Sequence, residues 1–358
     1  MFDKDNLEAL ELLIDTYNDT DQDTLVLIGK YYLKLDKVIR TRIDKISEKE
    51  ISLTISLEDK EIHKKIKFPK TVDGASDVST FLYSYLSEAR INAPKDYPKT
   101  RLEKLIENTL NLETYITNVK TKKIISSNII EITFEGGLEN LPDLKNDAFM
   151  YFMVHKEIDH KFPKNFTIQN FRSLSSQENN PYSAAYYTIK SYRENEIDVW
   201  FVLHDHPGPL AIWADQVKEG SSVAIWGPRT VFSPPKETNN YLFIADETAQ
   251  PAVLSAIENL HKNHSYTCLF ETQNKSSRFK INDPNNQILW IYRDQELAGE
   301  GTELIKCIER LNLNSKNLYV FGAGEAKQIS SIRKILKRQF NLGTKQMSFT
   351  GYWRKLAN

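Results

Sequence analysis

The spacing of apolar side chains changes twice along the chain and divides it into three predicted domains. Residues 7–17 carry apolar groups at helical spacing, and the alternation at 24–43 and 51–68 predicts two hairpins. A second helix starts at Asp77 and has an apolar face. This order predicts a small α+β domain over residues 1–110.

Short strand-like segments fill the middle of the chain. Each combines aromatic and branched side chains with turn residues on either side, which is typical of antiparallel strands. The six predicted strands cover residues 115–119, 129–134, 149–155, 166–172, 185–190 and 197–204. Six strands at such short intervals predict a closed antiparallel β-barrel over residues 113–235.

The last part of the chain alternates between strands and helices, which predicts a parallel sheet with helices on both faces. The predicted strands lie near residues 241, 266, 288, 318 and 348. The resulting doubly wound α/β domain covers residues 236–358. A barrel followed by such a sheet resembles the ferredoxin-reductase architecture, in which flavin binds the barrel and a nicotinamide dinucleotide binds the sheet.

One strand-to-helix turn carries the most informative sequence of this domain. Tyr241–Ala245 is an apolar run, Asp246, Glu247 and Thr248 follow it directly, and helical spacing begins at residue 249. Acidic and hydroxyl groups suit the unpaired N–H groups at the start of a helix. Open α/β sheets bind ligands at the carboxyl ends of their strands. The turn is therefore a predicted ligand site.

The segment Asp246-Glu-Thr-Ala-Gln-Pro-Ala252 also resembles the D-E-T-A-x-P-A signature of siderophore-interacting proteins. Other segments resemble motifs of that family and occur in the family's order: 204–214, 226–229, 290–293, 321–326 and 351–354. The resemblance covers residues 172–354. It implies a flavin-dependent oxidoreductase that uses NADPH or NADH to reduce a ferric siderophore or another ferric chelate, releasing Fe²⁺ in iron acquisition.

The resemblance also implies which residues contact the cofactors. Residues 172–177 are matched to the family motif R-x-Y-T-x-R, which lies on a barrel strand and binds FAD. Residues 208–213 are expected to hold a phosphate at a helix start, and Gly322-Ala-Gly324 to allow close approach of the dinucleotide. The expected contacts are Arg172, Ser175, His204, Gly208, Pro209, Leu210, Ala211, Trp213, Asp246, Glu247, Thr248, Gly322, Gly324, Glu325 and Trp353. No catalytic side chain is expected, because the flavin carries the chemistry.

Leu174, Gln177 and Ala211 depart from the family pattern, and they leave a second function open. In that alternative the chain is a non-enzymatic paralogue with weak or lost flavin that binds haem, a ferric chelate or a protein. A third alternative is a reductase partner for haem breakdown. It follows from the resemblance of residues 1–110 to the small domain that accompanies haem-utilisation split-barrel oxygenases. The plain expectation for residues 1–110 is a packing domain or a homodimer contact.

Two further sets of residues suggest ligands only weakly. His204 and His206 flank Asp205, but no third ligand lies at zinc spacing, so no metal site is expected. His155 and His160 are treated as surface residues. A basic run at 327–338 would suit the 2′-phosphate of NADPH, although such runs are more often a solvated helix face.

Composition excludes several classes of protein. The 358 residues carry a net charge of −1, which gives no basic field for nucleic acid. Two cysteines cannot form a disulfide framework. The N-terminal sequence does not read as a signal peptide, and no apolar run is long enough to cross a membrane. We therefore expect a cytoplasmic protein.

Overall fold

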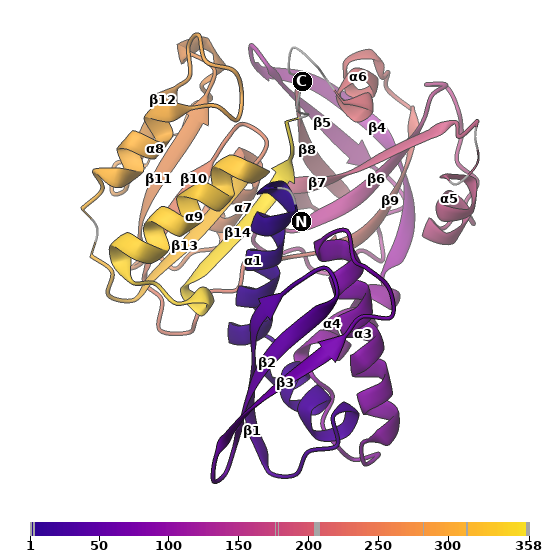
Figure 1. Cartoon of the computed structure of the whole chain (residues 1–358). Helices are drawn as coiled ribbons and strands as arrows, with labels where there is room; N and C mark the ends of the chain where they lie inside the picture. Colours follow the sequence, from indigo (N-terminus) through magenta and orange to yellow (C-terminus); the bar gives the residue numbers. More distant parts are fainter. Residues whose placement is uncertain are drawn as a thin grey trace. The chain divides into compact units, whose positions relative to one another are not determined.

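The computed structural model describes residues 2, 4–175, 177, 179–203, 208–281, 283–312 and 314–355. The chain forms two compact units, residues 1–111 and residues 112–358 (Figure 1). The second unit contains both the barrel and the parallel sheet.

The first unit packs helices against a three-stranded antiparallel sheet of order β1-β2-β3. Its elements are α1 (Lys4–Asp19), α2 (Gln22–Leu27), a π-helical turn (Ile28–Tyr32), β1 (Val38–Ile46), β2 (Glu50–Leu57), β3 (Glu61–Lys67), α3 (Ala75–Asn92) and α4 (Arg101–Leu110). The predicted α+β class and the hairpin of β2 and β3 are confirmed.

The predicted hairpin at 24–43 is wrong, because residues 22–32 are helical. Leu25 and Ile28 are buried three residues apart, which is helical spacing that the alternation obscured. Gly29 lies inside the π-helical segment. A Cβ at this position would lie 2.9 Å from Thr41 Oγ1 on β1. The glycine therefore allows the helix to approach the sheet closely.

The first half of the second unit is a closed six-stranded antiparallel barrel of order β4-β5-β8-β7-β6-β9. Its strands are β4 (Glu113–Ser126), β5 (Ile129–Glu135), β6 (Phe149–His155), β7 (Tyr182–Arg193), β8 (Glu196–Val202) and β9 (Ser222–Arg229). Two short helices accompany them: α5 (Ile168–Ser175) and α6 (Pro209–Gln216). Inward side chains of all six strands fill the barrel with one apolar core.

The barrel is confirmed, but one predicted strand is wrong. Residues 166–172 lie largely in α5, and the sixth strand is β9. Thr167 and Asn170 exchange hydrogen bonds at the start of α5, which satisfies N–H groups that a helix start leaves unpaired. Ile168 and Phe171 are buried three residues apart. In so short a segment, this spacing is easily mistaken for a strand.

The second half is a five-stranded, all-parallel sheet of order β12-β11-β10-β13-β14. Its strands are β10 (Asn240–Ala245), β11 (Ser265–Thr272), β12 (Gln287–Tyr292), β13 (Leu318–Glu325) and β14 (Met347–Trp353). Its helices are α7 (Gln250–Glu258), α8 (Thr302–Glu309) and α9 (Ala326–Phe340), with 3₁₀ turns at Lys275–Ser277 and Thr344–Gln346. The doubly wound class is confirmed.

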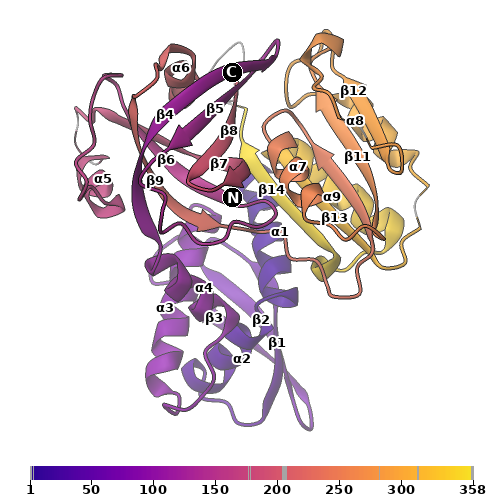
Figure 2. The same ribbon diagram turned by 180° about the vertical axis from the view of Figure 1, so that it is seen from behind.

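Helices cover both faces of this sheet. The apolar residues of α8 and α9 share one core with Leu242 and Ile244 of β10, whereas those of α7 share another with Phe243 and Ala245. Figure 1 shows α8 and α9 from their side, and Figure 2 shows the side of α7. The α7 core also includes Trp200 of β8, so barrel and sheet share buried side chains within this unit.

Candidate functional site

The carboxyl ends of β10, β11 and β12 meet in a buried group of charged side chains, Glu247, Glu271 and Arg293, which we call the edge cluster. Glu247 follows β10 directly and accepts two hydrogen bonds from Arg293, each 2.8 Å long. Only 1% of Glu247 is exposed. Burial alone would raise the pKa of Glu247, but the hydrogen bonds and charge of Arg293 outweigh it and lower the pKa. A bidentate pair of this kind fixes both chain segments.

Glu271 is the third member of the edge cluster, and its environment is different. It is fully buried near the end of β11, and Arg293 Nη1 lies 3.4 Å from its Oε2. Gln328 of α9 donates a hydrogen bond of 2.9 Å to its Oε1. Burial raises the pKa of Glu271 to about 7, because the shared guanidinium compensates it only partly. The cluster therefore holds one firm ion pair and one carboxyl group that titrates near neutral pH.

Asp246 closes the turn after β10 and ties it to the last strand. Its Oδ1 accepts bonds from the N–H and hydroxyl of Thr248, at 2.9 and 2.5 Å. Its Oδ2 accepts a bond of 2.7 Å from the indole N–H of Trp353. Gly324 of β13 lies so close that a Cβ there would stand 2.8 Å from Asp246 Oδ2. Its φ of +154° also favours glycine.

The remaining predicted residues of this edge also have structural partners. Glu325 is 1% exposed, and it accepts bonds from the backbone N–H groups of Gln328 and Lys355. A Cβ at Gly322 would meet the ring of Phe349 at 2.4 Å, so packing between β13 and β14 requires the glycine. The acidic side chains of this sheet edge are therefore held in place by hydrogen bonds from neighbouring residues of the same edge. Their predicted contacts with a nicotinamide cofactor stay predictions.

A pair of enclosed hydroxyl groups lies where the barrel meets the last strand of the sheet. The Thr188 hydroxyl on β7 and the Tyr352 phenol on β14 are both buried, and in the described part of the chain neither makes a hydrogen bond of ordinary geometry. Burial raises the pKa of Tyr352, and a weak hydrogen bond with the Thr188 hydroxyl opposes this shift, so the two hydroxyls are close neighbours. Buried hydroxyls without partners are costly, so they indicate a place for a polar ligand.

Tyr187, beside Thr188 on β7, points to the opposite side of the strand. Its ring packs against Phe201 with centroids 4.4 Å apart, and burial raises the pKa of its phenol. Helix α6 packs against β7 and β8 at this part of the barrel. Gly208 is the N-cap of α6, Pro209 has no N–H, and the N–H groups of Ala211 and Ile212 donate to the Gly208 carbonyl. In the first turn this leaves the Leu210 N–H to face a phosphate.

The side chains of α6 itself serve the barrel. Leu210, Ala211 and Trp213 are buried, and the indole of Trp213 lies 6.1 Å from the ring of Phe201. A phosphate at this helix start would therefore be held by the backbone. Ala211 lacks the hydroxyl of the family pattern, and its side chain is buried.

The structure does not place Arg172 and Ser175 on a barrel strand, and this part of the prediction is wrong. Both residues lie on α5, where Arg172 is exposed and its guanidinium stacks 5.7 Å from the ring of Trp226. The Ser175 hydroxyl donates to the carbonyl of Arg172. His204 and His206 lie outside the described residues.

The Y-T pair of the family motif has a second match on a true barrel strand, at Tyr187-Thr188-Ile189-Lys190. Ala185 and Lys190 stand where the motif has its two arginines. The sequence analysis did not single out Tyr187 and Thr188, because it matched the motif by its first arginine, at Arg172, and not by its Tyr-Thr pair. The signal that could have found them was the Y-T pair inside a long apolar strand that leads into β8.

His155 and His160 are not independent surface residues. Their rings stack with centroids 4.0 Å apart and lie against Tyr182 and Phe162. Burial and the neighbouring imidazole lower the pKa of His160. Among the described residues, no group of three or more His, Cys, Asp or Glu could hold a metal ion.

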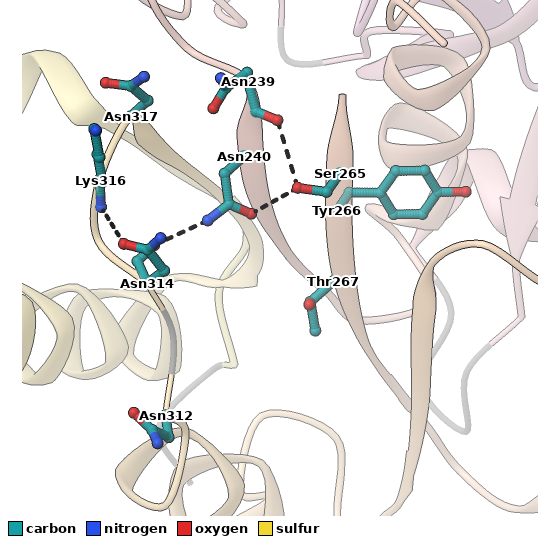
Figure 3. Close-up of a pocket in the computed structure, with 9 residues that line it drawn as sticks. All are labelled: Asn239, Asn240, Ser265, Tyr266, Thr267, Asn312, Asn314, Lys316 and Asn317. Carbon is teal, nitrogen blue, oxygen red and sulfur yellow. Dashed lines mark hydrogen bonds between the residues drawn. The ribbon is translucent and has the colours of Figure 1, made fainter. Parts of the chain in front are cut away.

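The opposite, amino edge of the sheet carries an open hollow of about 560 Å³ (Figure 3). Its lining is mostly asparagine, and the side chains bind one another or the backbone. Asn240 donates a bond of 2.9 Å to the carbonyl of Asn314 and accepts one of 3.3 Å from Ser265. Open α/β sheets bind ligands at the carboxyl ends of their strands, so this hollow is not the candidate site.

A six-stranded barrel capped by a short helix and joined to a parallel sheet defines the ferredoxin-reductase-like class. Within that class, the chain belongs to the family of siderophore-interacting proteins. Residues 118–232 match the siderophore-interacting FAD-binding domain, and residues 238–356 match the domain named siderophore-interacting protein. The two matches leave residues 1–117 outside the family.

Two relatives illustrate this membership. The ferric vibriobactin reductase ViuB of Vibrio cholerae is 24% identical over 243 residues, which are 66% of this chain and 88% of that protein. The ferric acinetobactin reductase of Acinetobacter baumannii is 22% identical over 171 residues, covering 47% of this chain and 59% of that protein.

Solved structures agree on the fold. A siderophore utilization protein from T. fusca superposes with a TM-score of 0.59 at 22% identity, covering 69% of this chain and 95% of the other. The siderophore-interacting protein SipS from Aeromonas hydrophila gives 0.56 at 20% identity, covering 68% and 99%. None of the helices in the described part of the chain has an apolar stretch of membrane-spanning length.

Proposed function

We propose that this protein is a flavin-dependent reductase that uses NADPH or NADH to reduce the iron of a ferric siderophore or a similar ferric chelate. The observation that carries the proposal is the pair of buried, neighbouring hydroxyls of Thr188 and Tyr352, which make no hydrogen bond of ordinary geometry in the described part of the chain. They lie between the barrel, which matches an FAD-binding domain, and the carboxyl edge of the sheet. The names of the relatives point to ferric chelates as the electron acceptor.

The residues present fit an FAD molecule. The Thr188 and Tyr352 hydroxyls would bind the polar edge of the flavin ring, and the backbone N–H of Leu210 at the start of α6 would bind one of its phosphates. Bound FAD would supply a two-electron acceptor for hydride from the nicotinamide and a one-electron donor to the ferric chelate. Fe²⁺ is then released, because it binds hard oxygen ligands less tightly than Fe³⁺.

The chain's own residues set position and access. The bonds from Asp246 to Thr248 and Trp353 hold the turn after β10 in one geometry. The ion pair of Glu247 and Arg293 connects the carboxyl ends of β10 and β12. We infer that Thr248 and the backbone of this turn orient the nicotinamide, while the indole of Trp353 shields the site from water.

Ferrous iron release tests the function directly. Purified protein with added FAD is mixed anaerobically with NADPH or NADH and a ferric chelate, and Fe²⁺ is trapped with a coloured ferrous chelator. We expect Fe²⁺ to form catalytically, many turnovers for each protein, and to need all three components. Iron release at the rate of free FAD alone would contradict the proposal and favour the non-enzymatic alternative.

A further inference from the structure

One loop runs along the carboxyl edge of the parallel sheet. Residues 294–301 connect β12 to α8, and we call this segment the strap. It starts just after β12, the first strand in the order β12-β11-β10-β13-β14. Before α8 begins, the strap reaches Glu325 at the end of β13 and Trp353 at the end of β14. It therefore passes the ends of β11 and β10, where the turn after β10 forms the candidate dinucleotide site.

Two glycines allow the strap to lie closely against this edge. A Cβ at Gly299 would stand 2.6 Å from Glu325 Cγ and 3.4 Å from the indole of Trp353. The φ of +78° at Gly299 also favours glycine. A Cβ at Gly301 would stand 1.9 Å from Glu271 Oε1. The strap thus has one close-fitting position on the sheet edge.

Beyond its first residue, the strap is held in this position by few polar contacts. In the described part of the chain, its side chains form one ion pair with the sheet edge, between Glu300 and Lys355, whose side chains are 53% and 32% exposed. The Gly301 carbonyl accepts a long bond of 3.3 Å from Gln328. Leu297, the one large apolar side chain of the strap, is 55% exposed. Exposed ion pairs contribute little to stability, so the strap can leave the edge at low cost.

The charge of the strap conflicts with that of a dinucleotide. Its sequence is Asp-Gln-Glu-Leu-Ala-Gly-Glu-Gly, which has three acidic residues and no basic one. Lys355, the partner of Glu300, is fixed to the edge, because its backbone N–H donates to the Glu325 carboxylate. It follows Trp353 by two residues. The Glu300 carboxylate therefore occupies a cation beside the candidate dinucleotide site, as a phosphate group would.

We propose that the strap is an autoinhibitory contact, in which Glu300 competes with a phosphate of NADPH or NADH for Lys355, and that the dinucleotide binds by displacing the strap. This inference rests on the proposed function and adds a regulation to its dinucleotide site. Two anions cannot share one cation without repelling each other, so the closed strap and the bound phosphate exclude one another. The apparent affinity is then the intrinsic affinity multiplied by the fraction of molecules in which the strap is open.

Isothermal titration calorimetry of the full chain with added FAD, using NADP⁺ and NAD⁺ as probes, measures this competition without hydride transfer. We expect Glu300→Gln to bind at least one of the two about fivefold or more tightly than the parent. Glu303→Gln is the matched control, because it also removes an exposed carboxylate that pairs with a lysine, Lys306. The control should stay within about twofold of the parent. Equal affinities of the parent and Glu300→Gln for both probes would overturn the inference.

Replacement of the lysine separates competition from general charge repulsion. In a Lys355→Gln background, Glu300→Gln should change the affinity by less than about twofold, because no cation is left to compete for. A gain as large as the one in the parent background would show that Glu300 acts only by repulsion at a distance, and it would overturn the competition.

Hydrogen exchange followed by mass spectrometry reports on the strap itself. Saturating NADP⁺ or NAD⁺ should speed the exchange of amides in residues 294–301 and slow the exchange in residues 246–250. Slower exchange in both segments would mean that the strap closes over the ligand, which is the opposite of the proposal.

The two proposals fail in different ways. Absence of dinucleotide binding by both the parent and Glu300→Gln would remove the reductant from the proposed function and overturn it, together with the strap. Dinucleotide binding whose affinity does not depend on Glu300 would overturn the strap alone and leave the proposed function standing.

Discussion

At the scale of single residues, this protein places its ionisable groups in two different environments on one sheet edge. Glu247 has both oxygens on Arg293, and its pKa is lowered. Glu271 shares the same guanidinium at a longer distance, and burial raises its pKa to about 7. The difference follows from geometry, because Arg293 makes its bidentate pair with Glu247 and reaches Glu271 only through Nη1, at 3.4 Å. The fold must therefore accept a cost when Glu271 ionises.

That cost predicts how stability depends on pH. The pKa of Glu271 is about 7 in the folded chain and near 4.5 as a free side chain, so the folded state holds the proton longer. Stability from this group is complete below about pH 4.5 and is lost as pH rises toward 7, by about 3 kcal/mol in all. Glu271→Gln, which imitates the protonated form, should remove this loss between pH 5 and 8.

Urea unfolding measured by tryptophan fluorescence checks this, because all five tryptophans lie in residues 200–353. Glu247→Gln is the matched control, and it should destabilise the protein without flattening the pH profile. Parallel pH profiles for the parent and Glu271→Gln would refute the account of Glu271.

At the scale of elements, long strands and periodic helices could be predicted from sequence, whereas short segments could not. The first of the parallel strands is an apolar run that ends sharply at the polar turn Asp246-Glu-Thr248, and the structure confirms the parallel sheet that such strands predicted. The predictions for residues 166–172 and 24–32 were wrong, because a few apolar residues fit the period of a helix as well as that of a strand. Residues 185–190 were predicted as a strand, but the R-x-Y-T-x-R motif was matched at Arg172, because that segment supplies the first arginine and residue 185 is an alanine.

The contact between β13 and β14 yields a test at this scale. Gly322 is read from the structure as a packing glycine, because a Cβ there would meet the ring of Phe349 at 2.4 Å. Gly322→Ala should therefore destabilise the second unit by about 1–3 kcal/mol, since overpacking forces the ring to move. Adding Phe349→Leu should restore much of that loss. Urea unfolding of the two variants checks this, and a single variant as stable as the parent would contradict it.

At the scale of the whole molecule, the barrel and the sheet of the second unit are joined by contacts between side chains of the two halves. Trp200 and Phe279 pack across the two halves, and Asn128 of the barrel donates to Glu247 of the edge cluster. Thr188 and Tyr352 are far apart in sequence, and nothing in either segment predicts that both hydroxyls are buried near each other. Long-range pairing of this kind depends on the closed barrel and the parallel sheet together.

The central claim is that FAD binds between these halves at Thr188 and Tyr352. Fluorescence titration of the full chain with FAD, compared with Thr188→Val and Tyr352→Phe, tests it most directly, because each variant removes a hydroxyl and keeps the shape. We expect the parent to bind FAD and each variant to lose about 1–2 kcal/mol of affinity, roughly five- to thirtyfold. Equal FAD affinity in all three proteins, or no binding by the parent, would contradict the account.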